Sequence, residues 1–289
     1  MVVKKEQKEN TGGKKMISKK FMLSDKKKQI GNVVLFRIKA LINTKFFKKG
    51  ELGGWIEKES NLSQNGNAWV SGNAQVYGNA RVSGNAQVYD DARVSGNAWV
   101  YDDARVYGDA RVYGDARVSG DAWVSGDAWV SGNAWISGNA RVYGNAWVYG
   151  DARVYSDARV YSDAYLQFGS LTVDIYSNLR AYIASSLNIY PIKGIYYLYK
   201  RVNKISDGKY SSCYDNETIY EDGKITRVKD YNPDMKISCS RGIHASTPFY
   251  NTQGDTLIAV KVRVTDIITC QEGKVRCKAV TTIGEMKGV

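Results

Sequence analysis

Histidine, the residue used most often in general acid–base catalysis, is scarce in this chain. Histidine occurs once, at His244, and the natural nucleophiles beside it in sequence are Cys239 and Ser240. A histidine next to a thiol or hydroxyl is the arrangement that activates a nucleophile. Nothing in the spacing of these three residues requires such a site, and a motif without its structural context is only a hypothesis. We therefore expect no catalytic residues and a structural or incidental role for His244.

The cysteines and acidic residues do not predict a metal site either. Cys213, Cys239, Cys270 and Cys277 contain no C-x-x-C pair, so the spacing of a zinc site is absent. Asn and Asp recur along the chain, but six to eight oxygen ligands for one calcium ion are not concentrated anywhere. We expect reduced thiols, no metal and no cofactor.

Arginine and aromatic side chains recur every six residues between positions 69 and 165. This column holds eight Arg, six Trp, two Gln and Tyr165. Trp, Tyr and Arg dominate protein-binding hot spots, and they also stack sugars or the bases of single-stranded nucleic acid. The alternative is that the rows only stabilise the sheet surface. The residues we predict to bind are Arg93, Arg111, Trp129, Trp147, Tyr165, Trp99, Trp123 and Trp135.

The column belongs to a hexapeptide repeat, [Asn/Asp]-Ala-x-Val-[Ser/Tyr]-[Gly/Asp/Ser], which runs from residue 67 in seventeen copies without an insertion. Alternate side chains of an extended segment face opposite sides, so Ala and Val share the inner face and the variable residue points outward. Gly, Asn and Asp accept the positive φ of a corner. Each hexapeptide is thus one short strand plus one corner, and the fixed period predicts stacked coils with parallel strand pairing.

Three hexapeptides per coil would make a triangular solenoid with three outward rows. The first row would be Gln75, Arg93, Arg111, Trp129, Trp147 and Tyr165. The second would be Trp69, Gln87, Arg105, Trp123, Arg141 and Arg159. The third would be Arg81, Trp99, Arg117, Trp135 and Arg153. At the spacing of parallel strands, Arg would stack on Trp in cation–π ladders.

The spacing of the aliphatic and small residues resembles the hexapeptide pattern of left-handed triangular β-helices. Ser or Tyr follows the aliphatic residue here, where that family often has Gly, Ala, Glu or Asp. Acyltransferases of this fold generally use a histidine to activate the acceptor, and carbonic anhydrases of this fold use three histidines on a metal. The repeat contains no histidine. The resemblance therefore implies the fold without either activity.

Two further segments resemble proteins of phage and bacterial genomes. Residues 50–57 and 61–63, followed by the Gly-Asn-Ala-x-Val run, look like uncharacterised hexapeptide-repeat proteins. Residues 239–246 are similar to a small domain of unknown function that accompanies penta- or hexapeptide repeats. The resemblance implies a phage or prophage setting, in which inhibition of a host-defence system is one plausible use.

The rest of the chain divides around the repeat. We expect an all-β protein with a disordered basic arm over 1–31, an N-terminal cap over 32–66, the β-solenoid over 67–168, a C-terminal cap over 169–191 and a small β-rich α+β domain over 192–289. Strands are expected over 33–42, 194–202, 256–264 and 274–283. Leu171, Ile175, Leu179 and Ile183 are spaced by four, so the second cap is helical or a degenerate coil.

Charge is unevenly distributed. The chain carries a net charge of +12, and residues 1–60 alone hold 16 Lys and Arg against 6 Asp and Glu. The basic arm therefore suits an anionic partner such as nucleic acid, or solubilises the chain. No secretory signal and no 18-residue apolar stretch is present, so we expect no membrane contact and a location in the cytoplasm of a bacterial host cell.

These observations favour a non-catalytic binding scaffold that presents Trp, Tyr and Arg rows to a protein partner, or to a second copy of itself. A carbohydrate- or nucleic-acid-binding module is the first alternative. An enzyme centred on the C-terminal domain, with His244, is the second.

Overall fold

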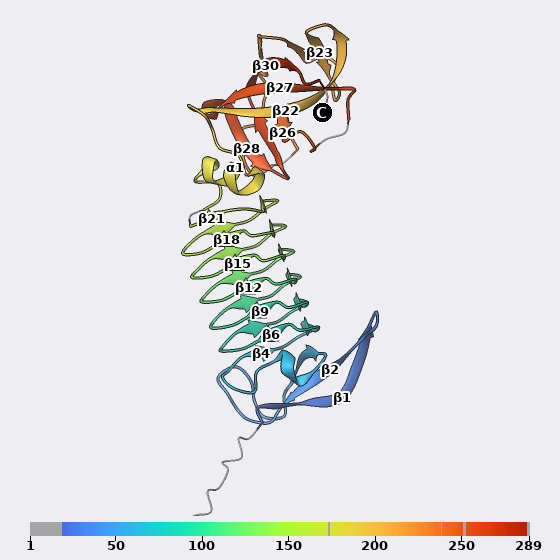
Figure 1. Cartoon of the computed structure of the whole chain (residues 1–289). Helices are drawn as coiled ribbons and strands as arrows, with labels where there is room; N and C mark the ends of the chain where they lie inside the picture. Colours follow the sequence, from blue (N-terminus) through green and yellow to red (C-terminus); the bar gives the residue numbers. More distant parts are fainter. Residues whose placement is uncertain (1–18, 173, 238, 251–252, 288–289) are drawn as a thin grey trace, which may run out of the picture.

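The chain forms a column of stacked coils with a hairpin at one end and a β-domain at the other (Figure 1). The computed structural model describes residues 19–172, 174–237, 239–250 and 253–287. The fold is all-β, with a parallel β-solenoid followed by an antiparallel domain, as the repeat and the C-terminal strands predict.

The solenoid has three sheets because each coil contains three two-residue strands. Residues paired in neighbouring coils are 18 apart, as in Arg105 with Trp123. We name the sheets and their outward columns faces A, B and C. In face A the coils contribute β5 (Gln75–Val76), β8 (Arg93–Val94), β11 (Arg111–Val112), β14 (Trp129–Val130), β17 (Trp147–Val148) and β20 (Tyr165–Leu166). Face B comprises β6 (Arg81–Val82), β9 (Trp99–Val100), β12 (Arg117–Val118), β15 (Trp135–Ile136), β18 (Arg153–Val154) and β21 (Ser170–Leu171). Face C comprises β4 (Trp69–Val70), β7 (Gln87–Val88), β10 (Arg105–Val106), β13 (Trp123–Val124), β16 (Arg141–Val142) and β19 (Arg159–Val160).

The solenoid core consists of the Ala and Val columns. Every Ala from Ala68 to Ala164 and every aliphatic residue from Val70 to Leu166 is at most 1% exposed. Fully burying a Val side chain contributes roughly 1.5–3 kcal/mol, so the repeated Val is a large stabilising contribution in each coil. The triangular cross-section and the composition of the three rows are confirmed. The left-handed winding stays a prediction.

The corners use positive φ at the last position of the repeat. Glycine fills this position in most copies, and Asp90, Asp102, Ser156 and Ser162 adopt the same backbone conformation in the others. Stacking is tight there: a Cβ added to Gly84 would lie 2.8 Å from the backbone nitrogen of Asp102 in the next coil. Asn and Asp tolerate this conformation better than most residues, which explains the two aspartates.

The N-terminal end shows that the expectation of disorder over 1–31 is wrong for residues 21–30. Strand β1 (Phe21–Ile30) pairs with β2 (Val33–Ala40), and β2 pairs with β3 (Leu52–Ile56), which joins β5 in parallel. Phe21 is fully buried and Lys20 Nζ donates to the Ala68 carbonyl oxygen at 2.8 Å. These tertiary contacts override the polar composition of the segment. Residues 1–18 lie outside the described residues.

The C-terminal end of the solenoid is covered by helix α1 (Leu179–Leu187). Helix α1 begins after Asn178, whose side chain accepts from the Ala181 N–H, and it packs against β20, β21 and β28. The backbone N–H groups of Gln167 and Phe168 donate to the Ser185 carbonyl oxygen. The helix therefore satisfies polar groups of the last coil that would otherwise be exposed.

The C-terminal domain is one antiparallel sheet. Its central strands are β22 (Ile195–Ser206) and β27 (Thr256–Arg263), which fall where the sequence predicts strands. The others are β23 (Lys209–Ser212), β24 (Ile219–Glu221), β25 (Ile225–Arg227), β26 (Ile243–Ser246), β28 (Ile267–Gln271), β29 (Lys274–Cys277) and β30 (Ala279–Glu285). Two 3-10 turns, η1 (Glu59–Asn61) and η2 (Val264–Asp266), complete the described elements.

Candidate functional site

The register of the coils decides which predicted binding residues lie together. Face A contains five of the eight in consecutive coils: Arg93, Arg111, Trp129, Trp147 and Tyr165. Trp123 lies on face C, and Trp99 and Trp135 lie on face B. The prediction therefore identifies one continuous row and three residues that point in other directions.

The half of face A nearer the C-terminal domain is an uninterrupted stack of side chains. The Arg111 guanidinium carbon lies 4.7 Å from the centre of the Trp129 ring. Trp129 and Trp147 stack with centroids 4.7 Å apart and planes at 5°, and Trp147 and Tyr165 follow at 5.2 Å and 22°. Because each ring lies against the next, both faces of Trp129 and Trp147 are covered, which leaves their edges for contact with a partner.

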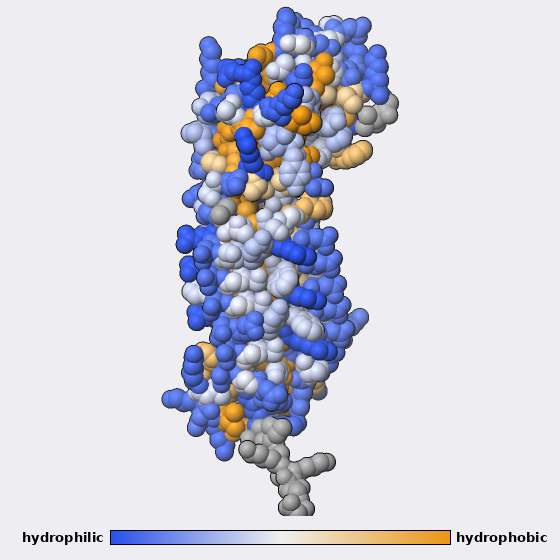
Figure 2. Space-filling view, turned by 60° about the vertical axis from the view of Figure 1, so that its left-hand side comes forward, coloured by the Kyte–Doolittle hydropathy of each residue, from blue (hydrophilic) through white to orange (hydrophobic). Residues whose placement is uncertain are grey.

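Tyrosines at the fifth position of the repeat contact the stack from the side. Tyr113 meets Trp129 edge-on at 6.0 Å, and Tyr149 meets Tyr165 edge-on at 6.4 Å. Trp147 remains 36% exposed. The face is therefore rigid and partly accessible. On the surface turned to the viewer in Figure 2, a pale band of intermediate hydropathy runs along the solenoid, while hydrophobic surface gathers over the C-terminal domain.

The half of face A nearer the N-terminal hairpin is cationic. The sequence analysis predicted Arg93 and Arg111 there but not the cations that the hairpin contributes. The hairpin extends the row, because Arg37 pairs with Trp55 and Trp55 pairs with Gln75. Lys28 Nζ lies 4.6 Å and the Arg37 guanidinium 5.3 Å from the centre of the Trp55 ring. The dipeptide Trp55–Ile56 repeats the outward–inward pair of every coil, and this signal could have placed it in the row.

These cations influence one another. Burial lowers the pKa of Lys28, and the neighbouring guanidinium groups of Arg37 and Arg93 lower it further, whereas Asp91 acts in the opposite direction. Arg111 continues the positive charge to the base of the aromatic stack. Face A thus changes along the axis from a cationic half beside the hairpin to an aromatic half beside the C-terminal domain.

On faces B and C, arginine covers the rings of Trp99 and Trp123. Trp123 lies between the guanidinium groups of Arg105, at 5.1 Å, and Arg141, at 4.7 Å. Trp99 lies between Arg81 and Arg117, at 5.5 and 5.8 Å. The cation–π ladders expected from the repeat are therefore present. They leave little free ring face on which a sugar or base could stack.

A polar ladder, not foreseen from the sequence, runs beside the outward columns. At several corners the side-chain amide of an Asn donates to the Asn or Asp one coil further on. The pairs are Asn67–Asn85, Asn85–Asp103, Asn79–Asn97, Asn97–Asp115, Asn133–Asp151, Asn139–Asp157 and Asn145–Asp163. On face C this ladder and the arginines border a shallow groove of about 340 Å³.

The C-terminal candidates for catalysis have other partners. Ser240 Oγ accepts from the Asn232 side chain at 2.9 Å, and Cys239 Sγ lies 2.9 Å from Lys274 Nζ. His244 sits in β26, half-buried, opposite Arg276 of β29. Within the described residues, no group of three or more His, Cys, Asp or Glu is placed to hold a metal ion.

The comparison with known families agrees with this geometry. Residues 74–87, 86–102, 98–113, 104–120, 110–126, 116–132 and 134–150 each match the model of the YdcK beta solenoid repeat. This protein is a repeat β-solenoid protein. No curated protein matches the chain. In the part of the chain that the structure describes, no helix has both the length and the apolar character needed to cross a bilayer.

Proposed function

We propose that this protein is a non-catalytic binding scaffold whose face A binds a protein partner. The observation that carries the proposal is the continuous row from Lys28 and Arg37 through Arg93 and Arg111 to the stacked rings. Rigid aromatic side chains lose little conformational entropy on binding, and Trp, Tyr and Arg are the residues enriched at hot spots.

The orientation of the rings favours a protein partner over a sugar or a nucleic-acid strand. Stacking of a sugar or base needs a free ring face, whereas Trp129 is covered by Arg111 on one side and Trp147 on the other. Ring edges and half-exposed guanidinium groups suit the mixed apolar and polar contacts of a protein interface.

The two halves of face A define the chemistry of the partner. The cationic half complements an acidic surface, and the aromatic half complements an apolar one. The partner is therefore expected to carry acidic residues beside an apolar patch. By the resemblance to phage and prophage proteins, we place it in the cytoplasm of a bacterial host, where inhibition of a host-defence factor is one use. A second copy of this chain is the alternative occupant.

The experiment compares baits that differ only in face A. Wild-type protein and the variant Trp129→Ala/Trp147→Ala are used to capture partners from nuclease-treated bacterial lysate at matched concentration. The matched control is Trp123→Ala/Trp135→Ala, which removes two tryptophans from the other faces. A protein retained at stoichiometric amount by wild type and by the control, but reduced at least about tenfold with the face A variant, supports the proposal.

Other results contradict it. Equal retention by both double variants would place the interface elsewhere. Material that is retained only from a parallel untreated lysate, and that is lost at high salt, would be nucleic acid held by the basic residues instead. Sedimentation of the free protein distinguishes self-association, because a face A dimer would dissociate in the Trp129→Ala/Trp147→Ala variant alone.

A further inference from the structure

On face B the outward column begins at Arg81. The coil before it, in the N-terminal cap, contributes no outward side chain to this column. The preceding coil joins this face through Leu62, which pairs in parallel with Val82. In that register Asn61 stands opposite Arg81. Asn61 is nevertheless fully buried, and its side-chain amide donates to the carbonyl oxygens of Gly78 at 3.1 Å and Ala80 at 2.9 Å.

The local backbone explains why this place has no outward side chain. In a regular coil the outward residue donates its backbone N–H to the next Ala carbonyl, as Arg81 does to Ala98 at 2.9 Å. In η1 the Asn61 N–H is used within the turn, donating to the Lys58 carbonyl oxygen at 3.0 Å. The Asn61 side chain must then satisfy the Ala80 carbonyl, since an unpaired buried acceptor is costly. The side chain is therefore directed inward.

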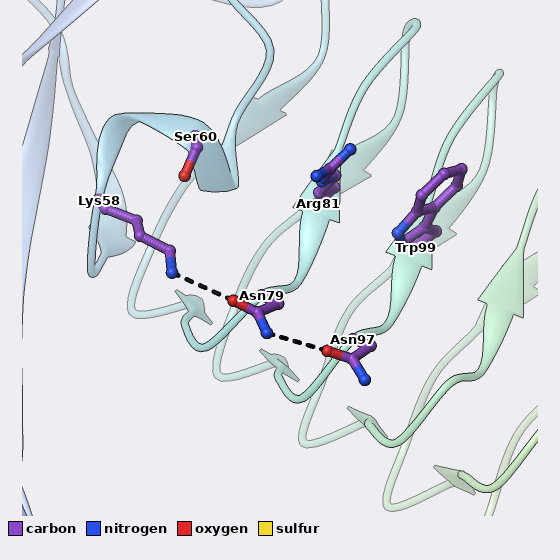
Figure 3. A pocket seen from close by; sticks show the side chains of 6 residues that line it. All are labelled: Lys58, Ser60, Asn79, Arg81, Asn97 and Trp99. Carbon is purple, nitrogen blue, oxygen red and sulfur yellow. Dashed lines mark hydrogen bonds between the residues drawn. The ribbon is translucent and has the colours of Figure 1, made fainter.

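The result is a hollow of about 300 Å³ beside Arg81, seen in Figure 3. It is lined by Lys58, Ser60, Asn79, Arg81, Asn97 and Trp99. Lys58 Nζ donates to Asn79 Oδ1 at 3.3 Å, and Asn79 Nδ2 donates to Asn97 Oδ1 at 3.1 Å. Figure 3 shows Arg81 between Trp99 on one side and the Lys58 and Ser60 side of the hollow on the other.

The hollow is positively charged. Lys58 and Arg81 are exposed, and among the described residues neither has a carboxylate within 4.0 Å. The nearby Glu57 carboxylate accepts from the Gly78 N–H at 2.6 Å. Arg81 packs over Trp99 on one side at 5.5 Å, which leaves its other face toward the hollow.

We propose that this hollow binds a planar organic anion of mononucleotide size. The planar ring occupies the missing place and stacks on the guanidinium of Arg81, continuing the ladder at the strand spacing of about 4.8 Å. The phosphate or carboxylate pairs with Lys58. Ser60 and the amides of Asn79 and Asn97 supply hydrogen bonds at the edge. The site lies on face B and is independent of the interface proposed for face A.

Isothermal titration of the full chain at low salt tests this site with four probes. AMP carries both the ring and the charge, adenosine the ring alone, inorganic phosphate the charge alone, and 2-naphthoate a planar ring with a carboxylate. Binding of AMP at least about tenfold tighter than adenosine and phosphate supports the proposal with a nucleotide as the source. The same preference for 2-naphthoate supports it with an aromatic carboxylate.

Variants locate the binding. Arg81→Gln and Lys58→Gln should each weaken it about tenfold, because the first removes the guanidinium on which the ring stacks and the second removes the partner of the anion. Ser60→Trp should abolish it by filling the hollow. The matched control Arg153→Gln, on the same face, should change it less than about twofold. Absence of AMP and 2-naphthoate binding at millimolar concentration, phosphate binding as tight as AMP, or equal affinities in Arg81→Gln and Arg153→Gln would each overturn the proposal.

Discussion

The solenoid and the C-terminal domain are stabilised in opposite ways. In the solenoid every coil repeats the same buried Ala and Val, and each strand pairs with residues 18 positions away. In the C-terminal domain the paired strands are far apart in sequence, as β22 and β27 are. The sequence of this domain does not repeat, so each buried residue has a surrounding of its own. Loss of one contact in the solenoid should therefore destabilise only the adjacent coils, because repeats interact only with their neighbours. Loss of one contact in the C-terminal domain should destabilise the whole domain.

This difference matters for function because the outward side chains of the solenoid are not needed for its core. Stability resides in the inward columns, so the outward columns are available for binding. Arg276 shows the contrast. It is fully buried in β29, and its guanidinium donates to the carbonyl oxygens of Asn232 at 2.7 Å, Ile237 at 3.1 Å, Arg241 at 3.4 Å, and also Asp234. Arg81 and Arg153, in the solenoid, are exposed.

The largest effect is expected from Arg276→Met. Several buried carbonyl groups would lose their donor, which should destabilise the C-terminal domain by about 3–5 kcal/mol. Hydrogen exchange followed by mass spectrometry should show loss of protection in residues 195–285 while the coils keep theirs. Simultaneous loss in both regions would show that the two unfold as one unit.

Val118→Ala in the middle of the solenoid should have a smaller effect. Removing buried methyl groups leaves a cavity and should destabilise the protein by roughly 2 kcal/mol. Hydrogen exchange should increase mainly in the coils that contact Val118. The matched control Arg117→Gln changes the outward neighbour and should stay within about 0.5 kcal/mol in urea denaturation. An equal effect of both variants would refute the division between inward and outward columns.

Tyr176 connects the two regions, and its contribution depends on pH. Its hydroxyl accepts from Gln271 Nε2 at 2.9 Å and donates to the Tyr161 carbonyl oxygen at 3.3 Å. Burial raises the pKa of Tyr176 well above its usual value. Above about pH 10 the unfolded chain loses this proton while the folded chain keeps it, so folding stability falls with pH.

Tyr176→Phe should therefore destabilise the protein by about 1 kcal/mol at pH 7, through the lost hydrogen bonds. The deficit should shrink at pH 11, since the variant escapes the alkaline loss of about 1.4 kcal/mol per pH unit. Urea denaturation at the two pH values measures this. Tyr190→Phe, at a residue that is 70% exposed, is the control. A deficit that grows with pH would contradict the assignment.

The smallest effect is expected in the polar ladder of the solenoid. Asn139 donates to Asp157, and Asn139→Asp replaces the donor with a carboxylate between Asp121 and Asp157 in neighbouring coils. The repulsion should cost about 0.5 kcal/mol at low salt and less in 1 M NaCl. Asn139→Ala loses the hydrogen bond without the repulsion, so its stability should not respond to salt in this way.

The same difference between the regions explains what the sequence could predict. A residue in the repeat has its environment set by its column, so the buried Val118 and the row from Arg93 to Tyr165 follow from the period alone. The first strand of the hairpin, β1, was missed because Phe21 and Lys20 are ordered by contacts with the cap and with Ala68, more than forty positions away.

In the C-terminal domain, strand positions could be predicted but their partners could not. The single strand expected over 274–283 is two strands. The Lys278 N–H donates to the Asp266 carbonyl oxygen at 2.7 Å, and there the chain changes from pairing with β26 and β28 to pairing with β27 and β25. The hollow beside Arg81 was equally invisible, because it arises from the inward turn of Asn61.

The most direct test of the central claim is hydroxyl-radical footprinting of the protein alone and in complex with the partner that wild type retains. Oxidation reads the solvent exposure of aromatic side chains. We predict that Trp129, Trp147 and Tyr165 become protected in the complex while Trp99, Trp123 and Trp135 keep the oxidation rates of the free protein. Protection of the second group with no change in the first would contradict the assignment of face A as the binding surface.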